Sequence, residues 1–314
     1  TRCAIKSRGL GDVYKRQHRH NAMRARNMAI AINHDAVCAL IREAAAQDIL
    51  PLWRNLEDHQ IEEKRRNDVV TDADRHCEQR LSDTLSALLP GSLVVGEEAV
   101  HADPGVLAAL DSVRPVWVID PLDGTNNFAS GSGPFAVMVC LLVGGETLGA
   151  WIYDPRADSM LTAEKGAGAS LDGVPLQLTT FTQGTSAISG ALSTRYLPDE
   201  LTPGALAGAQ RLGETRASGC AGYDYRALAT GQYQFAFYYR TLVWDHAPGV
   251  LIVTEAGGTA ARLDGGLYRP ATATTGLLCA CDTQTWRTVR DLVAPTYRPH
   301  ATQPTKAKGP DHGH

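Results

Sequence analysis

The sequence has no apolar run close to the ~20 residues that a membrane-spanning helix needs. Its longest run, residues 135–143, has the length of one strand. The chain also has no C-x-x-C pair: its seven cysteines stand singly, which predicts free, buried thiols in a reducing compartment. No internal repeat is present, so a solenoid is excluded. We therefore expect a cytoplasmic protein with no membrane partner.

Charge is unevenly distributed over the 314 residues. Residues 1–26 carry eight Lys or Arg and one Asp, whereas the rest of the chain carries 22 Lys or Arg against 33 Asp or Glu. An acidic body suits a protein that gathers divalent cations, and it argues against a general nucleic-acid surface. The alternative, a nucleic-acid or targeting arm at residues 1–26, rests on basic charge alone.

The pattern of apolar residues predicts helices and strands in one mixed fold, α+β or mixed α/β. The expected helices are residues 35–50, 72–89, 106–110, 221–230 and 283–292, and a helix with Pro248 in its first turn that runs to Glu255. The expected strands are residues 93–95, 115–119, 135–143, 147–153, 160–163, 169–171, 174–178, 187–192, 233–239, 259–263 and 277–281. The charged residues 58–67 are expected to form an exposed loop.

We expect residues 1–26 and 298–314 to be disordered, because they combine high polarity with little apolar sequence. Residues 27–297 should form the folded domain. A polar stretch at residues 179–190 separates an N-terminal half, about 27–180, from a C-terminal half, about 181–297.

The segment that carries most of the chemistry is residues 118–128 (VIDPLDGTNNF). An apolar strand ends there in two carboxylates, Asp120 and Asp123, and the Gly124-Thr125 pair follows at once. Hard divalent cations bind oxygen ligands, and phosphate binds backbone N–H groups at a helix start or a nest. Because this segment offers both, it predicts a metal-assisted phosphate site. Solvated turn carboxylates are the alternative.

Hydrolysis of a phosphate monoester by two metal ions needs several carboxylates from separate segments. Two further candidates, Glu97 and Asp245, join Asp120 and Asp123 because each follows an apolar run or begins a helix. A helix cap is the alternative for Asp245. Thr71 and Asp74 have the spacing of a capping box, a structural interpretation that does not exclude a catalytic role for Asp74.

Four segments in this order resemble the motifs of the inositol monophosphatase family of Mg²⁺-dependent, lithium-sensitive phosphatases. They are residues 68–74 (DVVTDAD), 96–99 (GEEA), 120–125 (DPLDGT) and 244–249 (WDHAPG), the last continuing to 255–258 (EAGG). A single motif of this kind is weak evidence, whereas four in order are strong. The resemblance spans roughly residues 33–295 and implies a layered αβαβα sandwich of the sugar-phosphatase type.

The resemblance also implies roles for individual residues. Glu97, Asp120 and the Leu122 carbonyl would bind one Mg²⁺, and Asp120, Asp123 and Asp245 a second, with a third ion held by Glu97 through water. Phosphate and substrate contacts would come from Asp123, Gly124, Thr125, Ala221 and Asp245. The Thr125 hydroxyl and Asp74 would activate the attacking water, with Glu97 as the third catalytic residue. Family members are commonly dimers, so a homodimer is implied.

Substrate recognition departs from the inositol-specific members of the family. Their sugar-binding Glu stands seven residues before the last metal-binding Asp, where this chain has Tyr238. Tyr238 and Arg240 would suit an aromatic or doubly anionic ligand, although ordinary strand packing also explains the tyrosine. His246 is expected to be structural, since Mg²⁺ rarely binds imidazole.

The expected function is hydrolysis of a small phosphorylated metabolite, such as an inositol monophosphate or another polyol phosphate, by a phosphomonoesterase that uses Mg²⁺. A 3′(2′),5′-bisphosphate nucleotidase, a fructose-1,6-bisphosphatase and a histidinol phosphatase are alternatives on the same site, because the motifs hold the phosphate and not the leaving group. A phosphometabolite-binding regulatory protein is the alternative that is not an enzyme. No nucleic-acid partner is expected.

Overall fold

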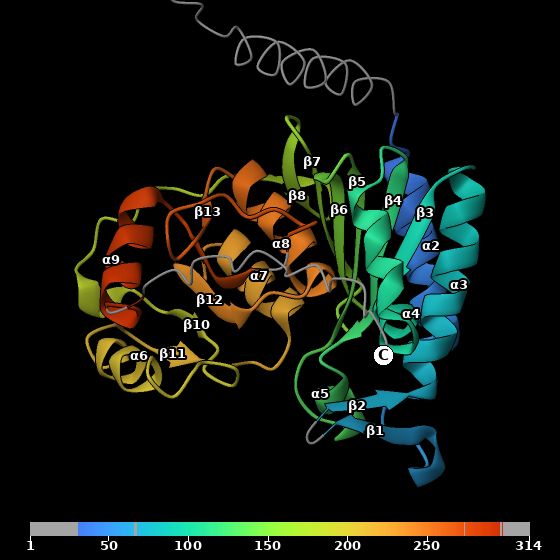
Figure 1. Cartoon of the computed structure of the whole chain (residues 1–314), viewed down its shortest axis with the longest axis horizontal. Coiled ribbons are helices and arrows are strands. Elements are labelled where there is room, and N and C mark those ends of the chain that lie inside the picture. The colour runs from blue at the N-terminus through green and yellow to red at the C-terminus, as the bar shows by residue number, and fades with distance from the viewer. Residues whose placement is uncertain (1–30, 66–67, 273, 296, 298–314) are drawn as a thin grey trace, which may run out of the picture.

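Two β-sheets organise the computed structural model, which describes residues 31–65, 68–272, 274–295 and 297 (Figure 1). The larger sheet has seven strands in the order β3-β4-β5-β6-β7-β8-β9, of which only β3 and β4 run parallel. These strands are β3 (Leu93–Gly96), β4 (Pro115–Asp123), β5 (Ala136–Val143), β6 (Glu146–Asp154), β7 (Ser159–Glu164), β8 (Gly168–Leu171) and β9 (Val174–Leu176). The segments expected to be disordered, residues 1–26 and 298–314, lie outside the described residues.

The second sheet has five strands in the order β11-β10-β12-β14-β13. Its strands are β10 (Gly190–Leu192), β11 (Thr215–Arg216), β12 (Phe235–Arg240), β13 (Thr259–Arg262) and β14 (Thr275–Ala280). All strands of the first sheet therefore precede the polar stretch at residues 179–190. The strands of the second sheet begin at the last residue of that stretch and follow it. The exact boundary between the two halves stays a prediction.

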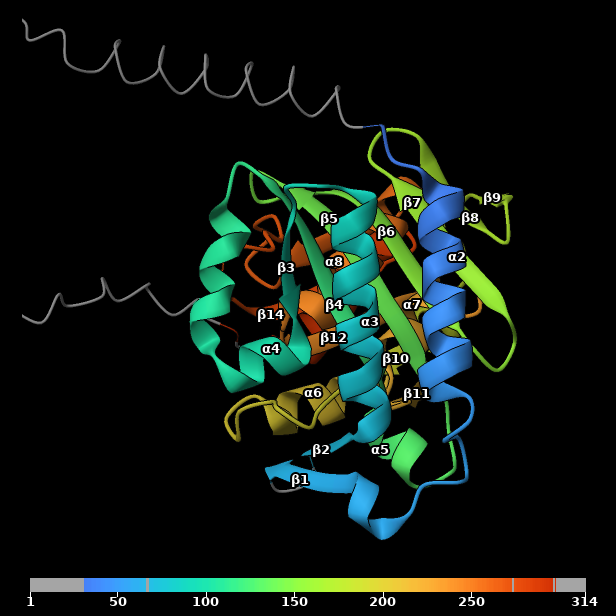
Figure 2. The same cartoon turned by 90° about the vertical axis from the view of Figure 1, so that its right-hand side faces the viewer.

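Helices cover both outer faces and fill the space between the sheets. Figure 2 shows α2 (His34–Ala44) and α3 (Asp72–Leu88) side by side over the seven-stranded sheet. The middle layer is α7 (Ala221–Ala229) and α8 (Val243–Glu255), and the far layer is α6 (Thr202–Ala209) and α9 (Thr283–Val293). Shorter pieces are a π-helix (Ala45–Ile49), α4 (Glu97–Ala102), α5 (Thr125–Ala129) and 3₁₀ turns at Asp58–Gln60, Pro104–Asp111 and Thr185–Ala187. The expected αβαβα sandwich is confirmed.

The apolar run of β4 fits this layering because successive side chains of a strand point to opposite faces. Val116 and Val118 pack against the middle helices, whereas Trp117 and Ile119 pack beneath α2 and α3. A strand buried on both faces has an almost continuous apolar sequence. The second sheet alternates in the same way: Cys279 and Cys281 both lie in the hydrophobic core between the sheets.

Some expectations were wrong. The loop expected at residues 58–67 is not found in its described part: Asp58–Gln60 is a 3₁₀ turn, and β1 (Ile61–Arg65) pairs with β2 (Asp68–Thr71). Residues 66–67 lie outside the described residues. The helix around Pro248 begins at Val243, so the proline lies inside it. Neither α6 nor β11 was expected: α6 has little apolar periodicity, and β11 is only two residues long.

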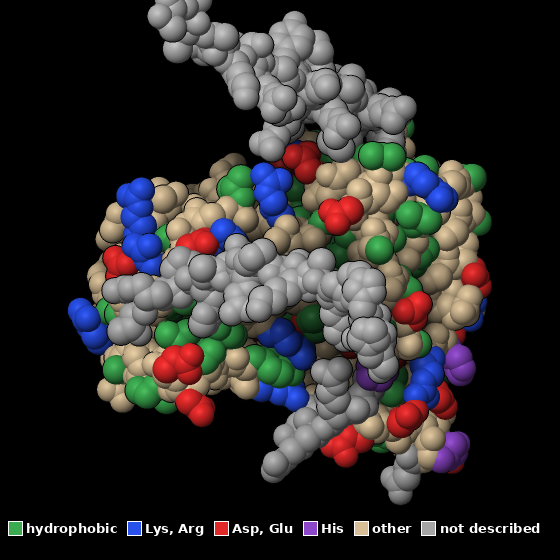
Figure 3. Space-filling model, viewed as in Figure 1, with side chains coloured by type: hydrophobic (Ala, Val, Ile, Leu, Met, Phe, Trp, Pro, Cys, Tyr) green, Lys and Arg blue, Asp and Glu red, His purple; other side chains and the backbone are tan. Residues whose placement is uncertain are grey.

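The described residues contain no helix that is both long and apolar enough to cross a membrane. Their six cysteines are free. On the face seen in Figure 3, acidic and basic side chains are interspersed.

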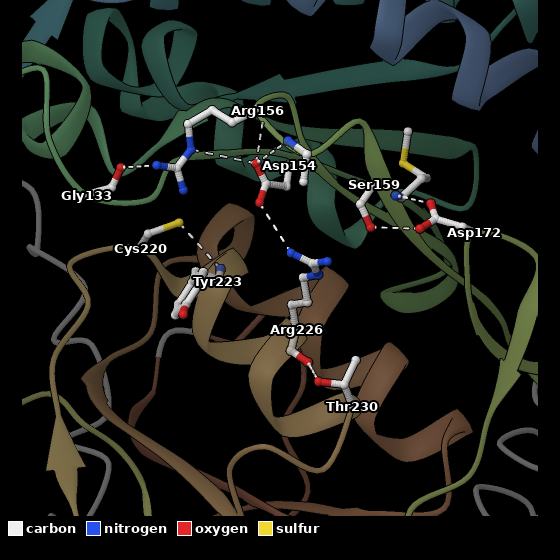
Figure 4. Close-up of polar contacts among 11 residues, drawn as sticks. Gly133, Asp154, Arg156, Ser159, Asp172, Cys220, Tyr223, Arg226 and Thr230 are labelled. Atoms are coloured by element: carbon white, nitrogen blue, oxygen red, sulfur yellow. Dashed lines mark hydrogen bonds and ion pairs between the residues drawn. The ribbon is translucent and has the colours of Figure 1, made fainter.

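A polar contact joins the seven-stranded sheet to the middle helices. Asp154, at the end of β6, accepts a hydrogen bond from Arg226 of α7 at 3.3 Å (Figure 4). The side chain of Asp154 is only 13% exposed and that of Arg226 30%, so this pair is less screened than a surface ion pair. The backbone N–H of Arg156 also donates to Asp154, at 3.0 Å.

We predict that Arg226→Met lowers the free energy of unfolding by about 1 kcal/mol, because it leaves Asp154 partly buried without its helical partner. Urea unfolding measures this change. Arg211→Met removes an exposed arginine at the end of α6 and is the control, with an expected change near zero. Equal effects of the two substitutions would show that the contact between the sheet and α7 does not stabilise the fold.

Candidate functional site

Asp74 joins the start of α3 to the segment after β4. Its Oδ2 accepts hydrogen bonds from the backbone N–H and the hydroxyl of Thr71, at 2.7 and 2.6 Å, so the expected capping box is confirmed. Its Oδ1 lies 3.1 Å from Thr125 Oγ1. Asp74 is 1% exposed. One carboxylate thus makes both the structural and the predicted catalytic contact.

Thr125 presents its hydroxyl between two acceptors. Besides Asp74, Oγ1 lies 2.8 Å from the Leu122 carbonyl. A threonine hydroxyl has one proton, and both neighbours accept hydrogen bonds, so the proton points at one of them and the oxygen lone pairs point elsewhere. When its proton points at Asp74, Thr125 Oγ1 donates to that carboxylate and keeps its lone pairs for other hydrogen-bond donors.

The end of β4 is irregular where the carboxylates stand. Pairing of β4 with β5 shifts register between Asp120 and Asp123, an irregularity that re-aims side chains at the end of a strand. Asp120 Oδ1 accepts the Leu122 N–H at 3.0 Å. Gly124 then has φ +87°, and a Cβ there would meet the Pro134 carbonyl at 2.8 Å. Only glycine fits both the conformation and the space.

The start of α7 fixes Asp123. Its Oδ2 accepts the Gly222 N–H at 2.6 Å and the Cys220 thiol at 3.1 Å. Burial raises the pKa of Asp123, while the hydrogen bonds from the Gly222 backbone, the Cys220 thiol and the Ala221 backbone oppose that rise. The start of α7 therefore fixes the position of this carboxylate at the edge of the cavity.

Glu97 is placed by a residue that the sequence analysis missed. Glu78 of α3 is buried and accepts the backbone N–H groups of Glu98 and Ala99, at 2.7 and 2.8 Å. These bonds cap α4, whose first residue is Glu97. The available signal was spacing: Glu78 is four residues after Asp74 and therefore shares its face of α3.

Asp245 lies in the first turn of α8, and the N-cap position belongs to Leu242. Asp245 is therefore not the N-cap residue of α8, although its carboxylate lies in the first turn of the helix. The next residue, His246, is buried between Tyr225 and the Arg240 carbonyl, each 3.1 Å from one ring nitrogen. Burial lowers the pKa of His246 to about 3, so the ring is neutral and has a structural role, as expected.

These segments meet at a cavity of about 350 Å³. Its lining includes the expected residues Glu97, Asp120, Leu122, Asp123, Gly124, Thr125, Ala221 and Asp245. Asp74 is the exception and lies behind Thr125. The lining also includes Arg195, Tyr196, Ser218, Asp224, Tyr238 and Arg240, of which only Tyr238 and Arg240 were considered from the sequence.

The carboxylates in this cavity repel one another. Burial raises the pKa of Asp120 well above its ordinary value, and the charges of Glu97, Asp123, Asp245 and Asp74 raise it further. Oxygen donors held together against their own repulsion fit a divalent cation, which removes that repulsion. Within the described ranges, no three Asp, Glu, His or Cys side chains stand close enough together to hold a metal ion without moving.

Known proteins match most of this chain. The model of the inositol monophosphatase family matches residues 33–299. A Nus factor SuhB of Vibrio cholerae is 30% identical over 242 residues, which are 74% of this chain and 87% of the relative. An inositol-1-monophosphatase of Rhizobium meliloti is 32% identical over 217 residues, 66% and 77% of the two chains.

Solved structures agree on the fold. Inositol monophosphatase-II of Staphylococcus aureus superimposes with a TM-score of 0.69 at 25% identity, over 82% of this chain and 92% of that one. An IMPase of Thermotoga maritima also has a TM-score of 0.69, at 22% identity, over 82% and 97% of the two chains.

Asp224 generates a prediction about pH. It is 4% exposed, and burial raises its pKa to about 7 from an ordinary 3.8. A carboxyl with a raised pKa stabilises the fold fully below about pH 4 and loses that contribution as the pH rises through about 7. We therefore compare the free energies of unfolding of Asp224→Asn and the wild type at each pH. The difference should shift in favour of Asp224→Asn by about 2 kcal/mol as the pH rises from 5 to 8.

Urea unfolding in EDTA at several pH values measures this difference. Asp111→Asn, at an exposed position outside the cavity, is the control and should show no such trend. A stability difference for Asp224→Asn that is the same at every pH would contradict the prediction.

Proposed function

This chain belongs to the inositol monophosphatase family, and from that premise we propose that it uses Mg²⁺ to hydrolyse one small phosphorylated metabolite. The chain is a phosphomonoesterase of this superfamily; the metal, the substrate and the residue roles are the proposal. Its main support is that carboxylates from three separate segments, Glu97, the Asp120–Asp123 pair and Asp245, line one cavity beside Gly124 and Thr125.

The family resemblance implies the metal ligands, and all of them line that cavity. Glu97, Asp120 and the Leu122 carbonyl would hold one ion, and Asp120, Asp123 and Asp245 a second. Bound there, the ions would lower the pKa of a water molecule and neutralise the phosphoryl oxygens. Mg²⁺ fits because all of these donors are oxygens. Family resemblance adds sensitivity to lithium.

The other residues would orient the substrate or accept protons. Thr125 Oγ1 would accept the proton of the attacking water while its own proton passes to Asp74 Oδ1, 3.1 Å away, which would act as the base. Gly124 and Thr125 would direct backbone N–H groups at the phosphate, with Ala221 beside the leaving alcohol. Since Gly222 and Cys220 fix one oxygen of Asp123, the position of this carboxylate is set before substrate binds.

The substrate is the least constrained part of the proposal. An inositol monophosphate or a related polyol phosphate remains the first candidate because of the family. Tyr238, where inositol-specific members have a Glu, favours one of the other phosphate esters: an adenosine bisphosphate, fructose 1,6-bisphosphate or histidinol phosphate. We further propose a cytoplasmic homodimer without a nucleic-acid partner.

A regulatory role is the second candidate function. The observation that favours it is the name Nus factor SuhB, which belongs to relatives of 30% and 32% identity. Asp120→Asn separates the two functions, because it should abolish turnover while leaving the outer surface intact.

Turnover should depend on the carboxylate cluster. We expect wild-type protein to release inorganic phosphate in Mg²⁺ from at least one of four substrates, and from none of them in EDTA. The four are inositol monophosphate, fructose 1,6-bisphosphate, histidinol phosphate and adenosine 3′,5′-bisphosphate. Asp120→Asn should lower kcat at least about 100-fold, because it removes a ligand shared by both ions. Asp111→Asn is the matched carboxylate control. Nearly unchanged activity in Asp120→Asn would refute the two-metal proposal.

The hydroxyl group of Thr125 should affect kcat more than the size of the side chain does. We expect Thr125→Val to lower kcat by a factor of about 100 or more, and Thr125→Ser, which keeps the hydroxyl, to stay within about tenfold of wild type. Steady-state kinetics at saturating Mg²⁺ measure both. Equal losses in the two variants would show that packing, and not proton transfer, explains the role of Thr125.

A further inference from the structure

Arg240 lines the proposed catalytic cavity without a carboxylate partner. It is the last residue of β12 and is half-buried. No ion pair joins its guanidinium to an Asp or Glu in the part of the chain that the structure describes. Arginine removed from water is normally paired with an anion, because an uncompensated charge is costly there. Such a guanidinium is available to bind an anionic group of a ligand in the cavity.

The backbone holds Arg240 in a fixed place relative to the metal site. Its carbonyl accepts a hydrogen bond from Nε2 of His246 at 3.1 Å, and Nδ1 of His246 lies 3.1 Å from the Tyr225 hydroxyl. Within the second sheet, Arg240 pairs with Thr275 of β14. Because His246 directly follows Asp245, this network fixes Arg240 relative to a proposed metal ligand.

An aromatic ring orients the guanidinium. Arg240 Cζ lies 3.9 Å from the centroid of the Tyr196 ring, and Arg195 Cζ lies 5.2 Å from the same centroid. A guanidinium over an aromatic face keeps its N–H groups free at the edges, where they can bind a carboxylate or phosphate with two hydrogen bonds. Arg195 and Tyr196 also line the cavity, so positive charge collects on this part of the wall.

We infer that Arg240 binds a second anionic group on the alcohol part of the substrate. The natural substrate is then a phosphomonoester that also carries another phosphate or a carboxylate. This inference rests on the proposed phosphatase function and goes beyond it by assigning the substrate class and the residue that selects it.

The test compares matched substrates. Adenosine 3′,5′-bisphosphate is paired with 3′-AMP, fructose 1,6-bisphosphate with fructose 1-phosphate, and phosphoserine with phosphoethanolamine. The first two pairs test a second phosphate and the third tests a carboxylate. Wild-type protein should hydrolyse the doubly anionic member of at least one pair with at least about tenfold higher kcat/KM, from hydrogen bonds between charged groups.

Substitutions assign that preference to one side chain. We expect Arg240→Gln to lower kcat/KM for the preferred doubly anionic substrate about 10- to 100-fold more than for its singly anionic partner, mainly through KM. Arg240→Lys keeps the positive charge but loses the paired N–H donors of the planar guanidinium. This variant should retain part of the preference. Arg287→Gln, at an exposed position of α9 outside the cavity, should leave both members unchanged.

The outcomes separate the two proposals. No phosphate release by wild-type protein from any of these six substrates, from inositol monophosphate or from histidinol phosphate would contradict the proposed function. Release without a preference for doubly anionic substrates, or equal losses for both members of a pair in Arg240→Gln, would overturn the assignment of Arg240 alone. Thermal unfolding of each variant shows whether a loss reflects misfolding. If Arg240→Gln unfolds, Arg240→Lys decides. A reduced preference for doubly anionic substrates supports the assignment of Arg240, and an unchanged preference overturns it.

Discussion

The constraint on which the site depends is the repulsion among carboxylates that share one buried cavity. Asp120 is 2% exposed, and the charges of Glu97, Asp123, Asp245 and Asp74 add to the effect of burial on its pKa. Keeping such groups together destabilises the folded state, since each negative charge disfavours the ionisation of its neighbours. A bound cation removes that cost, and for this reason the cluster is better explained by binding than by packing.

The rest of the structure counters this repulsion by fixing three of the carboxylates. Glu78 caps α4 beneath Glu97, the start of α7 holds one oxygen of Asp123, and Thr71 holds one oxygen of Asp74. Two of these anchors lie on α3 and α7, which pack in the hydrophobic core. The layered sandwich therefore acts as a rigid support, which metal-assisted catalysis requires.

The sequence predicted the strands of the seven-stranded sheet well, because burial on both faces produces apolar runs such as Val116–Ile119 that only a central strand satisfies. It also predicted the convergence of Glu97, Asp120, Asp123 and Asp245, since each ends an apolar run or lies at the start of a helix. Local pattern could not predict β1, whose charged residues pair only because β2 lies beside them. Nor could it find Arg195, which reaches the cavity from a loop after β10. Contacts between distant segments leave no periodic signal.

Thermal unfolding of the wild-type protein during titration with Mg²⁺ tests the central claim most directly, because an ion that binds only the folded state raises its stability with concentration. If the carboxylate cluster is a cation site, the melting temperature should rise with Mg²⁺, return to its starting value in EDTA, and rise much less in Asp120→Asn. A melting temperature that is independent of Mg²⁺, or that rises equally in the variant, would contradict the account.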